Sequence, residues 1–371
     1  MKLYTKLIVS ALLLSFFYGG YCVAQTLDEN GQPRGIPINE AGKEKYSAGW
    51  KLQFDNDLLI LGSDRDQDYT GGFNFTTSGR RAQESWWSLN PLLRGIDRLA
   101  GRNFQQRADN YVLHSAQIGL QVFSPSDIGE DSAIYDDRPF ANLVYLANSR
   151  RLVTSPTDPV YQSTLTLGLL GTQFGASIQN AIHRVVGSEQ PRGWDHQISD
   201  GGELTAQYAL SRQSLLSSNF QKSDKEYELK YDLGMSLGYI SELSTSLSYR
   251  WGHINTPWWS FTPESSNYAS LPAPVVGDAV RKNTRELFFL SGVKFRARAY
   301  NAFLQGQFRD SEVTFDASEL NPLIAEAWVG IGTQFSEFRV SYIIRTQTKE
   351  IKEGVGERNP IWGSLIVSRD F

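Results

Sequence analysis

The sequence lacks several features that would indicate a class of function. After its first two dozen residues it contains no apolar run of about 18 residues, so no helix is predicted to span a bilayer. The net charge of -4 is too small to indicate a nucleic-acid partner, and none is expected. There is one cysteine, Cys22, and there are four histidines: His114, His183, His196 and His253. A hydrolase with a histidine base must therefore use one of these four.

The start of the chain has the composition of an export signal. Lys2 and Lys6 precede the apolar run 7–18, and the small residue Ala24 stands at the expected cleavage point. We expect three parts: a signal peptide (1–24), an N-terminal periplasmic segment (25–47) and an outer-membrane β-barrel (48–371).

Lipid attachment at Cys22 is the alternative reading of this segment. The bulky Tyr21 stands where an attachment signal has a small residue, which disfavours it. Removal of the signal would leave a chain without cysteine. That excludes a disulfide framework, a catalytic thiol and a cysteine-ligated zinc site.

Alternation with period two is the main structural signal. Between Tyr227 and Tyr239, large apolar or aromatic residues occupy every second position, and polar or small residues occupy the others. This pattern is typical of a strand with one face toward lipid and one toward a barrel lumen. Aromatic residues make up 12% of the chain, which suits girdles at two membrane interfaces.

Twelve segments of about this length can be found, an even number as in bacterial single-chain barrels. The sequence therefore predicts an all-β fold, a twelve-stranded antiparallel transmembrane β-barrel with short helices in its loops. The stretch 285–310 can be read as one strand or two. The predicted strands are 48–57, 70–79, 112–123, 140–149, 162–173, 202–213, 226–240, 242–252, 285–298, 323–335, 337–347 and 361–371.

The last predicted strand ends on Phe371. A terminal aromatic residue after an alternating strand looks like the signal by which outer-membrane barrels engage the barrel-assembly machinery, so this machinery is an expected partner. With both termini in the periplasm, three connections would face outward: 58–69, 124–139 and 174–201. The connection 80–111 would be periplasmic, and its apolar residues indicate a short anchoring helix on the inner interface.

Two clusters in the outward connections could support chemistry. Gln179, Ile182, His183 and Val186 have helical spacing and are followed by Gly187, so His183 is expected on a short helix near the rim. Hairpin pairing should bring residues 54–57 beside 68–72, where carboxylates, an amide and a hydroxyl would converge. Such hard oxygen ligands suit calcium, although acidic hairpin loops are often only solvated.

Six motifs follow one another in order along the chain: Phe54-Asp55-Asn56-Asp57, Asp68-Tyr69-Thr70-Gly71-Gly72, Phe123-Ser124-Pro125, Asp137-Arg138-Pro139-Phe140-Ala141, Gln179-Asn180-x-x-His183-Arg184-x-x-Gly187 and Gly193-Trp194-Asp195-His196-Gln197. They resemble the motifs of the lipid A 3'-O-deacylase family of outer-membrane barrels. The similarity covers roughly residues 48–200; beyond that only the barrel pattern supports it.

The resemblance implies a calcium-dependent carboxylic ester hydrolase of the Gram-negative outer membrane that acts on the lipid A of lipopolysaccharide. It would remove the acyl or acyloxyacyl chain at the 3' position by attack of water, activated by a histidine, with calcium stabilising the oxyanion. Some members have a lysine after the Ser-Pro pair, whereas residues 126–130 here contain no base. Phosphate recognition or substrate choice can therefore differ.

Carried over by position, the resemblance makes His183 the general base. It assigns Asn56, Thr70 and Glu189 to the catalytic site, and Asp57 with Asn56 to the metal. It assigns substrate binding to Arg138, Gln179, Trp194 and Gln197, although Arg138 can equally be a structural loop residue. Two alternatives stay open: a phospholipid hydrolase with the same machinery, and a porin-like or structural barrel without enzymatic activity.

Overall fold

A computed structural model describes residues 43–60, 67–102, 104–105, 107, 110–155, 157–219, 226–275 and 285–371. The expected signal peptide and most of the segment 25–47 lie outside these residues. Twelve long strands form the wall. They are β1 (Gly49–Asn56), β2 (Asp68–Ser78), β3 (Tyr111–Ser124), β4 (Ala141–Val153), β5 (Val160–Leu170), β6 (Glu203–Ser218), β7 (Glu226–Gly238), β8 (Ile240–His253), β11 (Leu287–Asn301), β12 (Leu323–Phe335), β13 (Phe338–Gln347) and β14 (Ile361–Asp370).

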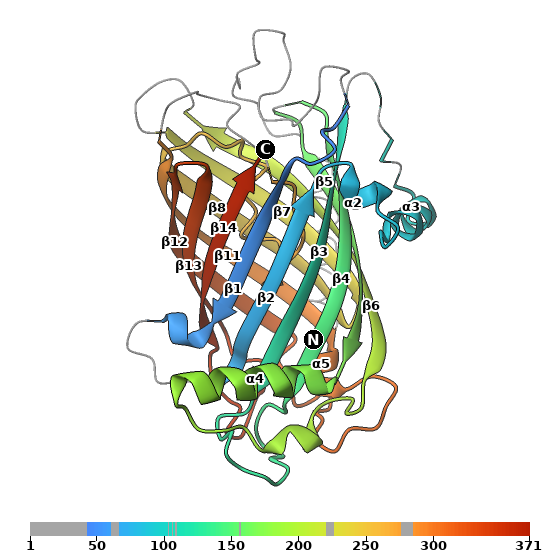
Figure 1. The fold of residues 1–371 in the computed structure, drawn as a ribbon, viewed down its shortest axis with the longest axis vertical. Helices are drawn as coiled ribbons and strands as arrows, with labels where there is room; N and C mark the ends of the chain where they lie inside the picture. The colour runs from blue at the N-terminus through green and yellow to red at the C-terminus, as the bar shows by residue number, and fades with distance from the viewer. Residues whose placement is uncertain are drawn as a thin grey trace, which may run out of the picture.

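The wall is one closed antiparallel barrel in which each strand pairs with its neighbours in the chain (Figure 1). Pairing of β1 with β14, from Gly49 opposite Asp370 to Asn56 opposite Gly363, closes it. The predicted twelve-stranded antiparallel barrel is therefore confirmed. The stretch 285–310 holds the single strand β11, and β4 and β6 extend several residues beyond their predicted ends.

The alternation of the sequence becomes the two faces of the wall. On β7, Glu228, Lys230 and Asp232 point into the lumen and are 1–3% exposed, whereas Met235 and Leu237 on the outer face are 46% and 69% exposed. Large apolar side chains are exposed around the outer face on most other strands: Phe54, Phe73, Ile118, Leu169, Leu204, Leu243, Leu247, Phe289, Val293, Phe295, Val329 and Ile331.

The two ends of the barrel differ. The α4 end carries η1 (Asp57–Leu59), α4 (Gln173–Val186), η2 (Gly193–His196) and α5 (Ala302–Gln305). The terminal end, where β1 begins and β14 finishes, carries α2 (Arg81–Glu84) and α3 (Asn90–Leu99) beside the wall (Figure 1). The short helix predicted in the connection 80–111 is thus α3.

None of the helices in the described part of the chain is long and apolar enough to cross a membrane.

A plug, defined as residues 254–275, fills the lumen, and the sequence analysis assigned no structure to it. It contains the two-residue strands β9 (Ser266–Asn267) and β10 (Ala269–Ser270), and its Trp258 and Trp259 are at most 1% exposed. Wall side chains bind its backbone: the Gln117 amide donates to the Ser270 carbonyl at 3.1 Å, and Lys294 Nζ donates to the Glu264 carbonyl at 2.9 Å.

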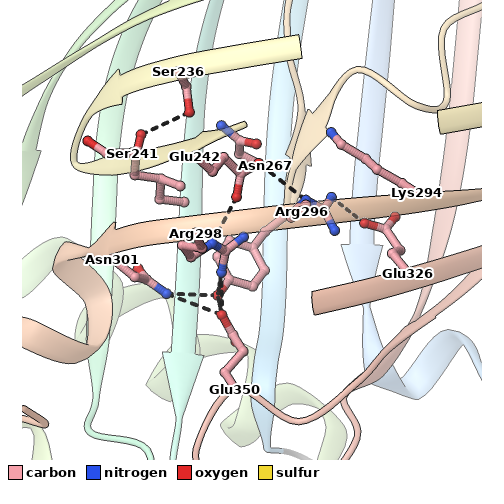
Figure 2. Close-up of polar contacts among 12 residues, drawn as sticks. Ser236, Ser241, Glu242, Asn267, Lys294, Arg296, Arg298, Asn301, Glu326 and Glu350 are labelled. Atoms are coloured by element: carbon pink, nitrogen blue, oxygen red, sulfur yellow. Dashed lines mark hydrogen bonds and ion pairs between the residues drawn. The ribbon is translucent and has the colours of Figure 1, made fainter. Parts of the chain in front are cut away.

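Buried ion pairs connect the plug, the wall and the α4 end (Figure 2). Arg298 Nε lies 2.8 Å from Glu242 Oε2, and its guanidinium also contacts Glu350. Arg296 bridges Glu242 and Glu326. Charges of both signs can be buried here because each has a partner of opposite sign.

Candidate active site

Helix α4 lies across the outer face of the wall at the α4 end, over strands β1 to β4 (Figure 1). Between helix and wall is a cavity of about 850 Å³. Its polar lining includes five residues assigned to the site from the sequence: Asn56, Thr70, Gln179, His183 and Glu189. Segments separated by more than a hundred residues therefore meet in one cavity.

The position of His183 follows from the helix pattern. Gln179 and His183, one turn apart, face the wall and are each 6% exposed. Gly187 ends the helix in the left-handed region with φ 74°, where glycine has no steric penalty. The helix also begins earlier than the expected segment, at Gln173.

One contact fixes the protonation pattern of His183. Its Nδ1 lies 2.5 Å from the backbone carbonyl oxygen of Glu189. A carbonyl oxygen can only accept a hydrogen bond, so Nδ1 carries the proton and the lone pair of the neutral ring is on Nε2. The ring in this state can take a proton at Nε2.

Asn56 and Thr70 come together through the β1–β2 hairpin. The Asn56 amide nitrogen donates to the Thr70 carbonyl at 2.6 Å, and the Asn56 side-chain oxygen caps η1 by accepting from Leu58 N at 2.7 Å. Thr70 has no partner in the β2–β3 register, where Tyr69 lies opposite Phe123 and Gly71 opposite Val122. This β-bulge lets Tyr69 turn inward while Thr70 lines the outer cavity.

The carboxylates of the hairpin diverge. Asp55 points into the lumen, where it accepts from Tyr69 Oη at 3.0 Å and from the Gln53 amide. Asp68 lies 3.4 Å from Arg138 Nε and 2.9 Å from Arg358 Nε. The hairpin thus brings the amide of Asn56 and the hydroxyl of Thr70 to the cavity, but neither of these two acids.

A chain of hydrogen bonds holds the site between wall and loop. Thr70 Oγ1 is 3.2 Å from Ser124 Oγ, which accepts from the Gln179 amide at 3.0 Å. The Gln179 oxygen accepts from Trp194 Nε1 at 3.1 Å. Ser124 was not assigned to the site from the sequence, although its place in the Phe-Ser-Pro motif was a signal. Trp194 is 4% exposed and supports Gln179 from behind.

Four assigned residues lie outside the cavity lining: Asp57, Arg138, Trp194 and Gln197. The Gln197 oxygen accepts from the Asn142 amide at 2.8 Å, and its own amide donates to Asp200 at 2.8 Å. Arg138, 2% exposed, is held by Glu350 and Asp68, which favours the structural role that the sequence left open. These contacts tie the outer loops together.

Asp57 is the assigned carboxylate ligand, and it supplies one hard oxygen donor of the kind that calcium binds. Its side chain is 2% exposed, and its Oδ2 accepts from Gln67 N at 3.0 Å. Among the described residues, no group of three or more His, Cys, Asp or Glu side chains could hold a metal ion. A calcium site here would use the Asn56 amide oxygen and backbone carbonyls as well, since calcium accepts neutral oxygen ligands.

The rest of the cavity is apolar. Its floor is the outer face of the wall, and its roof is the underside of α4, where Phe174, Ile178 and Ile182 line it. The floor residues continue the exposed apolar surface of the barrel: Phe54, Phe73, Ile118, Leu120, Val122 and Val144. Such a cavity suits a molecule with hydrocarbon chains and a polar group near His183.

A family model and one solved structure agree with this architecture. A family model described as "Outer membrane protein LpxR" matches residues 8–371. The solved structure of LpxR from Salmonella typhimurium superimposes with a TM-score of 0.67 at 16% identity, covering 87% of this chain and all of that one. The β domain of the Bordetella autotransporter BrkA reaches a TM-score of 0.39 at 9% identity, covering 88% of this chain and all of that one. No curated protein sequence matches.

Proposed function

This chain belongs to the LpxR family of outer membrane proteins, and from that premise we propose that it is an esterase that removes the 3'-linked acyl or acyloxyacyl chain of lipid A. The observation that carries the proposal is the position of His183, in a cavity whose floor is the outer, lipid-facing side of the wall. A lipid could reach this cavity sideways from the membrane without entering water.

The reaction would begin with a water molecule between His183 and the ester. Nε2 of His183 takes a proton from this water, and the oxygen attacks the ester carbonyl carbon. The carbonyl oxygen becomes negatively charged in the tetrahedral intermediate. When the intermediate collapses, the C–O bond to the sugar breaks, and His183 returns its proton to the sugar oxygen. The products are a free fatty acid and a lipid A hydroxyl.

Other residues of the cavity would orient this chemistry. The Glu189 carbonyl holds the ring of His183 so that Nε2 remains the basic atom. Thr70 and Gln179 are fixed by Ser124 at one end of the cavity. Their placement would keep the ester beside the histidine, and the apolar roof would hold the acyl chain and exclude bulk water.

Asn56 and Asp57 would hold a calcium ion, which would polarise the ester carbonyl and stabilise the oxyanion. Support for this comes from the buried carboxylate of Asp57 beside an amide oxygen at the end of β1. With both termini in the periplasm, as the sequence analysis expects, the α4 end would lie outside the cell, next to the leaflet that holds lipopolysaccharide.

The alternative of a passive channel has less support, because the plug occupies the lumen with buried tryptophans and ion pairs. A phospholipid hydrolase would use the same cavity, and only the products distinguish it. The test below therefore measures products from both lipid classes.

The experiment is mass spectrometry of lipid A and phospholipids from cells that express the folded protein. Wild type should lower the mass of lipid A by the 3' acyl group and leave phospholipids intact. His183→Ala should reduce the rate by about 10²–10⁴-fold, the usual contribution of a general base. His253→Ala, which changes an exposed imidazole at the terminal end of β8, is the matched control and should keep the activity.

Removal of calcium with a chelator should abolish deacylation, and added calcium should restore it. Unchanged lipid A in cells where the barrel is folded would contradict the proposed activity. Lysophospholipids as the only products would assign the protein to the phospholipid hydrolase class instead.

A further inference from the structure

Helix α3 lies outside the barrel at the terminal end, far along the wall from α4 (Figure 1). The segment from Arg81 to Gly101 contains α2, α3 and their connection, and it packs against the outer face of β3 to β5. The proposed hydrolysis makes no use of it. Its residues form three faces with different chemistry.

The first face docks the helix onto the wall. Leu93 and Asp97, one turn apart, are at most 1% exposed. Asp97 Oδ2 lies 2.7 Å from Arg150 Nη1 and accepts from Ser163 Oγ at 3.1 Å, while its Oδ1 accepts from Tyr208 Oη at 2.9 Å. The outer face of β4, β5 and β6 carries these three partners, Arg150, Ser163 and Tyr208. Helix α3 therefore covers polar groups that hydrocarbon could not solvate.

The second face is apolar and exposed. Leu92 and Leu99, seven residues apart, are 51% and 90% exposed, and Ile96 lies between them on the same stripe. Trp86, in the connection before the helix, is 96% exposed. Exposed apolar groups of this size on one helix face indicate a surface that another molecule or a membrane covers.

The third face is basic. Arg94 and Arg98, one turn apart on the side away from the apolar stripe, are exposed, and neither forms an ion pair with a described residue. Arg102 lies beyond the end of the helix, and its guanidinium lies 5.8 Å from the ring centroid of Tyr161 on the outer wall. The helix therefore presents two exposed arginines on one face, and a third arginine follows it at the wall beside an aromatic side chain.

We propose that α3 is an interfacial helix that binds anionic glycerophospholipids of the periplasmic leaflet. The occupant is a lipid because the wall that α3 adjoins is itself the lipid-facing surface of the barrel. An apolar stripe directed into the acyl chains, opposite arginines directed at phosphate groups, is the arrangement of helices that lie in a membrane interface. This proposal does not depend on the hydrolysis of lipid A.

Spin labels can test the orientation of the helix. The variants are Leu92→Cys, Leu99→Cys and Arg98→Cys, each made in a Cys22→Ser background and labelled with a nitroxide. The labelled protein would be placed in nanodiscs of phosphatidylethanolamine and phosphatidylglycerol. Labels at 92 and 99 should collide more with oxygen than with an aqueous nickel chelate, and the label at 98 should show the reverse. Equal access of nickel chelate to all three labels would overturn the proposal, and would leave the face free for a soluble partner.

Lipid retention tests the headgroup. Native mass spectrometry of the full chain should show bound phosphatidylglycerol, whose apparent affinity falls about fivefold for each arginine removed in Arg94→Gln/Arg98→Gln. The control Arg192→Gln/Arg309→Gln removes the same charge from exposed arginines at the α4 end and should leave retention unchanged. Equal loss in both double variants, or equal retention of phosphatidylcholine by wild type, would contradict a specific site.

Discussion

Among single residues, Glu350 connects several segments at the α4 end through buried contacts. Its carboxylate contacts Arg138 and Arg298 and accepts from Tyr268 Oη at 2.6 Å. Burial opposes its ionisation, but the two guanidinium groups outweigh this effect and lower its pKa. Through Arg138 the contact reaches Asp68, two residues before the bulge at Thr70.

Replacement of this buried charge should be costly. Glu350→Gln leaves two buried arginines undercompensated, so the free energy of unfolding should fall by about 3–5 kcal/mol. Glu357→Gln, in an exposed pair with Lys349, should change it by no more than about 1 kcal/mol. Urea titration of the folded barrel in lipid vesicles would measure both.

The sign of the pH dependence follows from the lowered pKa of Glu350. Its stabilising contribution is present above the pKa of an unfolded glutamate, about 4.3, and is lost as pH falls through the lower folded value. Acid destabilisation in that range should therefore shrink in Glu350→Gln. Equal stability of wild type and this variant would contradict the assigned role.

His196 forms a clasp between three outer segments. Its Nδ1 lies 2.6 Å from Glu312 Oε2 and its Nε2 lies 3.1 Å from the Asp131 carbonyl, while Tyr135 Oη donates to Glu312 at 2.9 Å. The hydrogen bond to Glu312 raises the pKa of His196, and the same bond lowers the pKa of Glu312.

The clasp should therefore be pH dependent. The histidine contribution is complete below about pH 6.5 and disappears as pH rises through the raised pKa, whereas the glutamate contribution is lost in acid below about pH 4.3. Proton NMR titration of the four histidines should show a lower pKa for His196 in Glu312→Gln. Glu319→Gln, in the same loop, should leave the titration unchanged, and an equal shift in both variants would rule out the clasp.

Among the elements, α4 depends on the turn that delivers it from β5. Gly171 has φ 73°, and a Cβ there would collide with the backbone carbonyl of Ser199. Both the positive φ and the lack of space require glycine. The turn fixes where α4 crosses the wall and thus the depth of the cavity under His183.

Gly171→Ala should displace α4 while leaving the barrel closed. Lipid A deacylation should fall by at least about tenfold, because a small misplacement of a catalytic group is costly. Heat-modifiable migration in gels would confirm that the barrel is folded. Gly95→Ala in α3, where a Cβ meets no atom within 4 Å, is the matched control. Full activity in Gly171→Ala would mean that the turn does not set the position of the helix.

For the molecule as a whole, the plug separates this barrel from an open channel. Lys230 Nζ lies 2.9 Å from Glu264 of the plug, and Gln162 donates to the Pro272 carbonyl at 3.0 Å. The plug is therefore bonded to the wall on several sides. A wall of twelve strands encloses little more space than these side chains occupy.

Replacement of residues 257–273 by a short Gly-Ser linker should open a conducting pore. Wild-type protein should be silent in a planar bilayer, and the variant should pass ions, since polar lumen residues such as Asp232 would then be hydrated. Heat-modifiable migration would again verify folding. Conductance in wild type equal to that of the variant would contradict a sealed lumen.

Much of this architecture could be predicted from local patterns. Alternation from Tyr227 to Tyr239 predicts β7 because lipid and lumen impose opposite preferences on neighbouring residues. The helical spacing of Gln179 and His183, ended by Gly187, predicts the part of α4 that carries the base. Both signals act within one element, so they can be recognised without knowledge of any partner.

Other features depend on partners far away in the chain. Thr70 reaches the cavity through a bulge against β3, which breaks the alternation from which its direction would be deduced. Arg138 appeared able to bind phosphate because the sequence does not show that Glu350, 212 residues later, already holds it. The plug has no strong periodicity of its own, so its sequence looks like a polar connection with a few aromatic residues. Its tryptophans are buried only because the closed wall surrounds them.

The sequence by itself thus determined the class of wall, the number of its strands and the helix that carries His183, because period and capping are local properties. The role of His183 as the candidate base came from the family resemblance. Only the tertiary structure decided that the lumen is filled, that the cavity lies on the outside of the wall, and which acids turn away from it. Those outcomes depend on the pairing of β1 with β14 and on ion pairs across the lumen. Both bring together segments that are far apart in the sequence.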